Sequence, residues 1–515
     1  MPGRPATRRA LAALASALAV AAVLVAPAYA PQAAEGQPSA QQVRGLAESP
    51  GERGTITWYP CQDDSWAGWE CGSLTVPLNW FDKANPANAE IAMAIKRSTA
   101  PDRIGAFTFN PGGPGGSGLG SALRIREMLP PEVRDRFDFV AWDPRGVGKS
   151  SPKLSGCPPE PDGPDLPATG SVDWAALIPP YIEELTQARA ACYAANEDLA
   201  PYLGTDYVIR DLEALRIALG EEQWTYWGMS YGTRIGLRCS RAFPTRFRAF
   251  LLDGSVAPNE TMISRSGQTA YKYAHVNAAF AGAVGGGMGV KLARVVSGMN
   301  DDTILINGRS IDRWRVFGNI YSNMGRQSNY PWIRKLIDEV YDALYGGTVD
   351  ETGFRRALKR LSESDDGSQT YFIDMVNCAD AQPWPTTDQV IRMVATASVT
   401  SSYTGSRDSL GRSTHCFGLP TDIAPPWRPI VSPLVRKVPP IVIQAYGDPA
   451  TAWLGGRMMS EFFAGAAFLS YTGTQHVAYM RTPSACINDP VTTYLLTLEV
   501  PKSATCPYVA SPPPE

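Results

Sequence analysis

One serine lies in a sequence pattern that is typical of a catalytic nucleophile. An apolar run leads into Gly228-Met229-Ser230-Tyr231-Gly232, and small and apolar residues follow it. Glycines on both sides permit the sharp strand-to-helix turn that presents a strained serine. The same spacing occurs in ordinary glycine-rich turns, so the position between an expected strand and an expected helix is what favours Ser230 as a nucleophile for acyl transfer.

A serine nucleophile needs a general base, and the chain contains three histidines, His275, His415 and His476. His476 is our candidate because it follows the last apolar strand pattern, and in sites of this kind the chain order is serine, acid, histidine. We interpret His275 and His415 as packed or solvated side chains, with His415 as a further candidate for the wall of the substrate cleft.

The acid that orients the base is expected at the end of the strand before the histidine's strand. Asp448 follows the apolar run 440–445 and meets this condition. Its role would be to hold the imidazole in the correct tautomer and to stabilise its charged form. Asp253, which follows an earlier strand pattern, is the alternative acid, and its other interpretation is a turn or capping residue.

A glycine-rich segment is expected to supply part of an oxyanion hole. Residues 110–118, Asn-Pro-Gly-Gly-Pro-Gly-Gly-Ser-Gly, directly follow an apolar strand pattern. We predict that the backbone N–H groups of Gly113 and Tyr231 stabilise the oxyanion. A phosphate-binding loop is the weaker interpretation, because the segment lacks the Lys-Ser/Thr ending of a P-loop.

These residues need a mostly parallel sheet with helices on both faces, and the patterns between 71 and 253 predict one. A helix is predicted at Asp206–Leu219, and further strands at 440–445 and 467–471. We divide the chain into a signal peptide at 1–34, a core at 35–257, a mainly helical lid at 258–437, a second core segment at 438–510 and a disordered tail at 511–515. The candidate strands of the first core segment are Ser73–Leu78, Glu90–Lys96, Gly105–Phe109, Phe137–Ala141, Gln223–Trp227 and Ala249–Leu252.

The N-terminus has the layout of a secretory signal. Arginines precede an apolar run at 10–26, which ends near the small residues Ala28 and Ala30. The run is shorter than the ~20 apolar residues of a membrane span. We therefore predict a secreted protein without membrane insertion after signal removal, and the paired Arg8 and Arg9 leave the twin-arginine and general export routes both open.

Cysteine content and net charge indicate which bonds, metals and binding partners to expect. Nine cysteines in an exported chain indicate disulfides. Proximity in sequence suggests the pairs Cys61–Cys71, Cys157–Cys192, Cys378–Cys416 and Cys486–Cys506, although other pairings remain open. Cys239 would then be a buried free thiol. The scattered cysteines and histidines predict no metal, and the chemistry needs no cofactor. The net charge of −3 gives no indication of nucleic-acid binding, and we expect a monomer.

Taken together, these motifs resemble the secreted tripeptidyl aminopeptidases of actinomycetes, relatives of the prolyl iminopeptidases within the α/β-hydrolases. The resemblance implies an α/β-hydrolase fold with a helical lid, cleavage of peptides from a free N-terminus, and acidic side chains that hold the substrate ammonium, for which Asp374 and Asp380 are candidates. The chain differs from the usual family pattern at Gln475, where glycine is common, and at Ala450 and Ala452. The segments that carry the resemblance are 110–118, 143–150, 227–233, 252–254, 447–449 and the cysteines 486 and 506.

The sequence therefore predicts a secreted serine exopeptidase that releases short peptides, expected to be tripeptides, through an acyl-enzyme on Ser230. A carboxylesterase or lipase-like hydrolase is the alternative, because it would share every catalytic part. A non-catalytic binding protein on the same fold is the weaker third hypothesis.

Overall fold

The computed structural model describes most of the chain. The described residues are 54–61, 64–82, 84–164, 172–285, 287–298, 303–306, 309–362, 368–400, 404–421, 423 and 434–511. The expected signal peptide and residues 512–515 of the expected tail lie outside these ranges.

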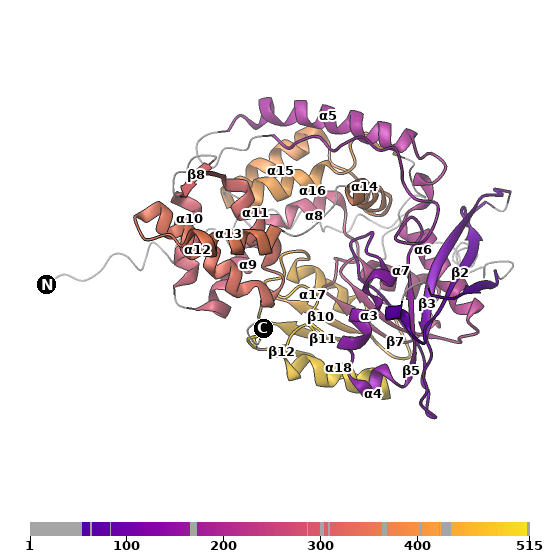
Figure 1. Ribbon diagram of the computed structural model, residues 1–515. Coiled ribbons are helices and arrows are strands. Elements are labelled where there is room, and N and C mark those ends of the chain that lie inside the picture. Colours follow the sequence, from indigo (N-terminus) through magenta and orange to yellow (C-terminus); the bar gives the residue numbers. More distant parts are fainter. Residues whose placement is uncertain are drawn as a thin grey trace.

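A ten-stranded sheet forms the centre of the molecule, in the order β1-β2-β3-β5-β4-β6-β7-β10-β11-β12 (Figure 1). The pairings from β1 to β5 are antiparallel, and every pairing from β5 to β12 is parallel. The carboxyl ends of the parallel strands therefore share one edge, where functional loops gather in such sheets. The strands are β1 (Ile56–Tyr59), β2 (Glu70–Pro77), β3 (Asn88–Lys96), β4 (Gly105–Asn110), β5 (Phe137–Trp142), β6 (Trp224–Met229), β7 (Phe247–Asp253), β10 (Ile441–Ala445), β11 (Ala467–Tyr471) and β12 (Ala504–Cys506).

Helices cover both faces of this sheet, which confirms the predicted α/β class. One apolar core packs beneath α6 (Thr205–Ala218), α7 (Gly232–Ala242) and α17 (Trp453–Glu461). The opposite core packs beneath α3 (Gly118–Met128), α4 (Pro131–Arg134) and α18 (Ala485–Thr497). The strands between them are buried on both faces, as their near-continuous apolar sequences require.

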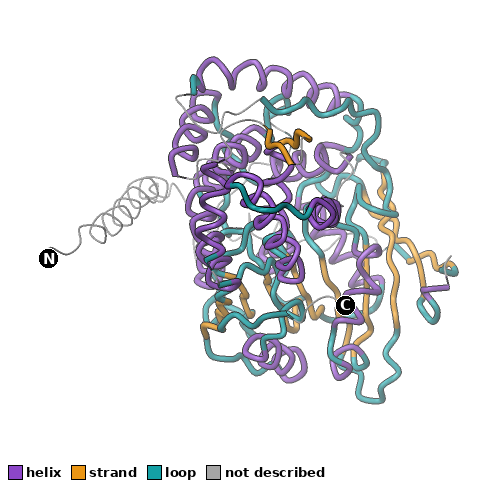
Figure 2. The backbone as a smooth tube through the Cα atoms, turned by 60° about the vertical axis from the view of Figure 1, so that its left-hand side comes forward, coloured by secondary structure: helices purple, strands orange, loops and turns teal. Residues whose placement is uncertain are grey.

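A helical insertion separates β7 from β10. It has its own apolar core, formed mainly by α9 to α13, while α14 contributes to the core beneath the sheet. Figures 1 and 2 show the insertion helices gathered on one side of the molecule, with the long helix α5 (Trp174–Ala194) across their outer side. The insertion contains α8 (Met262–Gly267), α9 (Thr269–Val284), α10 (Met288–Gly298), the hairpin β8 (Thr303–Ile306) and β9 (Arg309–Asp312), α11 (Arg313–Asn323), α12 (Tyr330–Tyr345), α13 (Glu351–Ser362), α14 (Ser368–Asp380), α15 (Thr387–Thr400) and α16 (Thr404–Thr414). Short 3₁₀ turns lie at η2 (Asp64–Trp66), η3 (Ala200–Tyr202) and η4 (Gln327–Asn329).

Four disulfides join the pairs that sequence proximity suggested, and Cys239 is a buried free thiol. One bond, Cys378–Cys416, ties α14 to the segment that follows α16 within the insertion. Within the described ranges, no helix combines the length and hydrophobicity that crossing a bilayer requires. The same residues include no group of three metal-ligating side chains.

Candidate active site

Ser230 lies at the carboxyl end of β6, in the turn that begins α7. Its φ of 54° is the strained left-handed conformation of a nucleophile elbow, and its N–H donates to the carbonyl oxygen of Asp253 over 2.9 Å. A Cβ at Gly228 would lie 2.5 Å from the carbonyl oxygen of Gly232, and a Cβ at Gly232 would lie 2.7 Å from that of Asn110. Both glycines are therefore needed for close backbone packing around the serine.

The candidate acid and the candidate base meet at the same edge of the sheet. Asp448 follows β10, His476 follows β11, and His476 Nδ1 lies 2.8 Å from Asp448 Oδ2. The other carboxylate oxygen accepts the N–H groups of Ala450 and Thr451 at 2.8 and 3.0 Å. Gln444 Nε2 and Thr451 Oγ1 donate to Oδ2 at 3.1 and 3.0 Å. This shell fixes the orientation of a side chain that is fully buried.

The loops that carry the histidine and the serine lie at the same edge of the sheet because their strands are close neighbours. The order β6-β7-β10-β11 places the loops of Ser230, Asp253, Asp448 and His476 side by side. A Cβ at Gly254 would lie 3.0 Å from His476 Cε1, while the preceding residue accepts the N–H of Ser230. The imidazole, with 22% of its side chain exposed, is thus packed against the loop that holds the nucleophile.

The glycine-rich segment after β4 packs directly against the elbow. A Cβ at Gly112 would lie 2.8 Å from Ser230 Cβ and 3.2 Å from the nitrogen of Tyr231. Gly112 and Gly113 have φ values of 92° and 105°, which only glycine adopts readily. Among the described residues, neither the N–H of Gly113 nor that of Tyr231 has a hydrogen-bond partner. The position and the free donors fit an oxyanion hole, so this assignment stays a prediction with geometric support.

Contacts from the helical insertion fix the loop of the histidine. The N–H of His476 donates to the carbonyl oxygen of Gly325 over 2.9 Å. Gln475 Oε1 accepts the N–H of Gln327 over 3.1 Å, and Gln475 Nε2 donates to the carbonyl oxygens of His476 and Val477 at 3.0 and 3.3 Å. The glutamine that departs from the family pattern therefore links the histidine loop to the segment between α11 and α12. Sequence reasoning noted the departure but missed this contact, which no local signal identifies.

Comparison with known proteins identifies the family. A model of the alpha/beta hydrolase fold matches residues 105–286, and a model of TAP-like proteins matches residues 401–506. Serine protease Hip1 of Mycobacterium tuberculosis (strain ATCC 25618 / H37Rv) is 31% identical over 484 residues, covering 87% of this chain and 90% of that protein. The chain belongs to the TAP-like serine hydrolases of the α/β-hydrolase fold. This result confirms the family resemblance of the motifs.

Two further relatives of this TAP-like hydrolase have different names. Tripeptidyl aminopeptidase of Streptomyces lividans is 32% identical over 243 residues, or 43% of each chain. Carboxylesterase B of Mycobacterium tuberculosis (strain CDC 1551 / Oshkosh) is 25% identical over 474 residues, covering 84% of this chain and 85% of that protein. Peptidase and esterase names therefore both occur among the relatives.

In this TAP-like hydrolase, the alternative acid Asp253 contacts the histidine loop rather than the imidazole. Its carboxylate accepts the N–H groups of Ala478 and Tyr479 at 2.8 and 2.9 Å. Burial raises the pKa of Asp253 from 3.8 to about 6, although these two hydrogen bonds act in the opposite direction. Asp253 thus supports both sides of the site, through its carbonyl oxygen on Ser230 and its carboxylate on the residues after His476.

The two candidates for amine binding are engaged in internal ion pairs. Arg189 Nε donates to Asp374 Oδ2 over 2.8 Å, and burial raises the pKa of Asp374 to about 7 against the effect of this arginine. Arg238 Nη1 lies 2.9 Å from Asp380 Oδ1, and Arg234 Nη1 lies 3.4 Å from Oδ2. Both carboxyl groups are almost fully buried. Amine binding by either residue stays a prediction, and these partners do not favour it.

The other two histidines of the hydrolase lie in the insertion. His275 Nδ1 is 2.8 Å from the carbonyl oxygen of Tyr271, and the ring packs edge-on against Tyr446. His415 Nδ1 lies 3.1 Å from Asp374 Oδ1, and burial lowers the pKa of His415 well below its ordinary value. Both are packed side chains, which agrees with their interpretation from the sequence.

Proposed function

We propose that the chain is a secreted serine exopeptidase that releases short peptides, tripeptides in the first instance, from free N-termini. The observation that carries the proposal is the His476–Asp448 hydrogen bond, at the same edge of the sheet as the strained Ser230 in a TAP-like chain. The peptidase names of Hip1 and of the Streptomyces relative support peptides as the substrate class. Export is supported by the four disulfides and by the N-terminal signal pattern.

The proposed reaction is acyl transfer through Ser230. Ser230 Oγ attacks the scissile carbonyl carbon while His476 Nε2 takes its proton, and Asp448 stabilises the imidazolium through Nδ1–H. The N–H groups of Gly113 and Tyr231 would bind the oxyanion of the tetrahedral intermediate. Collapse breaks the C–N bond, and His476 returns the proton to the leaving amine. Water then repeats the sequence on the acyl-enzyme and releases the acid.

Recognition of a free N-terminus would be strengthened by a carboxylate near Ser230, because charge-assisted hydrogen bonds are the strong ones. Because Asp374 and Asp380 have cationic partners, the substrate ammonium would have to displace an arginine or use a different acidic residue. In the proposal the insertion at 258–437 acts as a lid, since its segment at Gly325 packs on the histidine loop. A lid that contacts the site is suited to limiting the length of peptide that enters.

Carboxylesterase activity is the second candidate, favoured by the relative named Carboxylesterase B. The two candidates share the catalytic groups and differ in the acyl donor that the lid admits.

Matched chromogenic substrates test the proposal: a free-amine tripeptide anilide, its N-acetylated twin and a short acyl ester, each with wild type and Ser230→Ala. The exopeptidase predicts cleavage of the free-amine anilide, little cleavage of its acetylated twin, and loss of activity of about 10⁴-fold or more in the variant. Cleavage of the ester alone would instead establish the esterase.

A further inference from the structure

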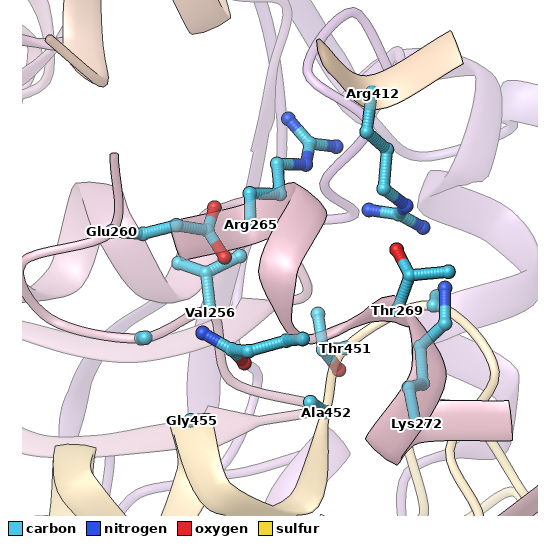
Figure 3. Close-up of a pocket in the computed structure, with 12 residues that line it drawn as sticks. Val256, Glu260, Arg265, Thr269, Lys272, Arg412, Thr451, Ala452 and Gly455 are labelled. Atoms are coloured by element: carbon cyan, nitrogen blue, oxygen red, sulfur yellow. The ribbon is translucent and has the colours of Figure 1, made fainter. Parts of the chain in front are cut away.

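A small cavity between the insertion and the loop of the catalytic acid has an unusual concentration of positive charge. Its volume is about 20 Å³, on a scale where one water molecule needs about 10–15 Å³. Figure 3 shows Arg265, Lys272 and Arg412 around this pocket, from α8, α9 and α16 respectively, together with Glu260. The remaining wall includes Ala450–Ala452.

The carboxylates near the pocket are already engaged by other cations. Asp408 Oδ2 lies 2.7 Å from Arg412 Nε and 3.1 Å from Lys272 Nζ, so one anion serves two cations. Glu260 pairs with Arg234 over 3.0 Å. These pairs leave no carboxylate dedicated to Arg265.

Arg265 differs from the other two cations of this pocket in its partners. Among the described residues its guanidinium has no ion pair and no hydrogen bond, and its Nη1 atom is completely buried. The side chain as a whole is partly exposed, but a guanidinium carries five N–H donors and stays charged, so a buried Nη1 without a partner is unfavourable. Such an orphaned cation at the wall of a polar cavity indicates that a negatively charged group completes the site.

The local electrostatics agree with this geometry. Burial lowers the pKa of Arg265 to about 10, and repulsion from Arg412 acts in the same direction, while the attraction of Glu260 and Asp408 acts against them. Burial likewise lowers the pKa of Lys272 to about 8, again with Arg412 contributing. An anion in the cavity would offset both effects.

We propose that this cavity binds one small monovalent anion, a halide or a formate-sized carboxylate, held by Arg265 with Arg412 and Lys272. The cavity size excludes sulfate and sugar acids. The anion would lie against Ala450–Thr451, the two residues whose N–H groups hold Asp448. It therefore ties α8, α9 and α16 of the insertion to the loop of the acid.

Thermal unfolding of the full chain tests the site with chloride as the probe. Wild type, Arg265→Gln and the control Arg457→Gln are melted in sodium gluconate, which is replaced stepwise by chloride at constant ionic strength. Arg457 forms an exposed ion pair with Glu461 and has no contact with the cavity. We expect a saturating increase in Tm of about 2 °C or more in wild type and in the control, and none in Arg265→Gln.

Parallel titrations separate the sources of the anion. If the increase in Tm saturates at a lower concentration of formate than of chloride, the ligand is a carboxylate. Sulfate should give no saturating increase in Tm. A wild type that shows no saturable response to chloride or formate, or an Arg265→Gln variant with the same response, overturns the proposal. Crystals soaked in bromide give an independent test: an anomalous peak beside Arg265 supports the site, and its absence overturns the halide assignment.

Discussion

The two sides of the candidate site are held in different ways. Ser230 is positioned by its own sheet, through the carbonyl oxygen of Asp253 and the close approach of Gly112. His476 is positioned in part from the insertion, through the carbonyl oxygen of Gly325 and the bridge made by Gln475. The geometry of the proposed nucleophile is therefore a property of the core, whereas the orientation of the proposed base depends on how the insertion docks.

This difference gives the insertion a role in positioning His476. A displacement of the segment at Gly325 would move the histidine loop while leaving the serine elbow intact. Asp253 is the residue at which both sides meet, since it contacts the elbow and the residues after His476. The predictions below change the two sides separately, from the largest expected effect to the smallest.

Asp448→Asn should have the largest effect on the histidine side. The amide would present a donor or a weaker acceptor to Nδ1 and favour the wrong tautomer, so we expect kcat/KM to fall by about 10⁴-fold. Steady-state hydrolysis of the preferred substrate measures the loss, and circular dichroism checks that the fold is retained. A loss below tenfold in folded protein would assign the acid's role elsewhere.

Gly325→Ala tests the docking of the insertion directly. The new Cβ would lie 3.0 Å from Pro449 Cγ and 3.2 Å from His476 Cβ, so these neighbours must move by a few tenths of an ångström. We expect a decrease in kcat/KM of about tenfold, since small displacements of a catalytic base are costly. Gly318→Ala is the matched control. Gly318 lies in the neighbouring helix α11, and a Cβ there would meet no atom within 4 Å. Equal activity of the two variants would contradict the dependence of His476 on the insertion.

Gln475→Met should have a smaller effect of the same kind. Methionine keeps the volume but removes the acceptor for the N–H of Gln327 and the donor to the histidine loop. We expect a loss of about three- to tenfold in kcat/KM, since each lost hydrogen bond is worth about 1 kcal/mol. The rate of fluorophosphonate labelling should fall in parallel, because both this rate and kcat/KM depend on proton removal from Ser230 by His476.

The control for this variant is Gln389→Met, which removes a similar acceptor for the N–H of Thr386 at the start of α15. It should leave both rates unchanged. If labelling keeps its wild-type rate in Gln475→Met while hydrolysis falls, Gln475 acts on substrate binding rather than on His476.

The pH dependence of stability tests the junction at Asp253. The pKa of about 6 in the folded protein, above the ordinary 3.8, means that the folded state binds the proton more tightly than the unfolded state. The contribution of Asp253 to the free energy of unfolding is fully present below pH 3.8 and is lost as pH rises through about 6. The loss amounts to about 3 kcal/mol. Denaturant unfolding of wild type and Asp253→Asn between pH 4.5 and 8 should show wild type losing stability relative to the variant as pH rises. A pH-independent difference would contradict the raised pKa.

The serine side of the site, which the core positions, was also the side that the sequence predicted well. The elbow at Ser230, the strand before it and the order of acid and base follow from local patterns, and the structure places these residues at neighbouring strand ends. The parallel sheet was predictable because short strand patterns alternate with helical stretches along the chain. The short edge strands β1 and β12 were not predicted, since their few residues carry little periodic signal.

Contacts between distant segments were beyond sequence reasoning. The link from Gln475 to Gln327 depends on how the insertion docks on the core. The ion pairs of Asp374 and Asp380 depend on helices far apart in the chain, and a single sequence does not reveal which arginines reach them. The unpaired Arg265 is visible only when the partners of all its neighbours are known.

Labelling of the folded protein with a fluorophosphonate, followed by intact and peptide mass spectrometry, tests the central claim most directly. The account predicts one adduct per chain, located on Ser230, and a labelling rate that is strongly reduced in Gly325→Ala but not in Gly318→Ala. A folded protein that takes no label, or that carries it on another residue, would contradict the assignment of Ser230 as the nucleophile.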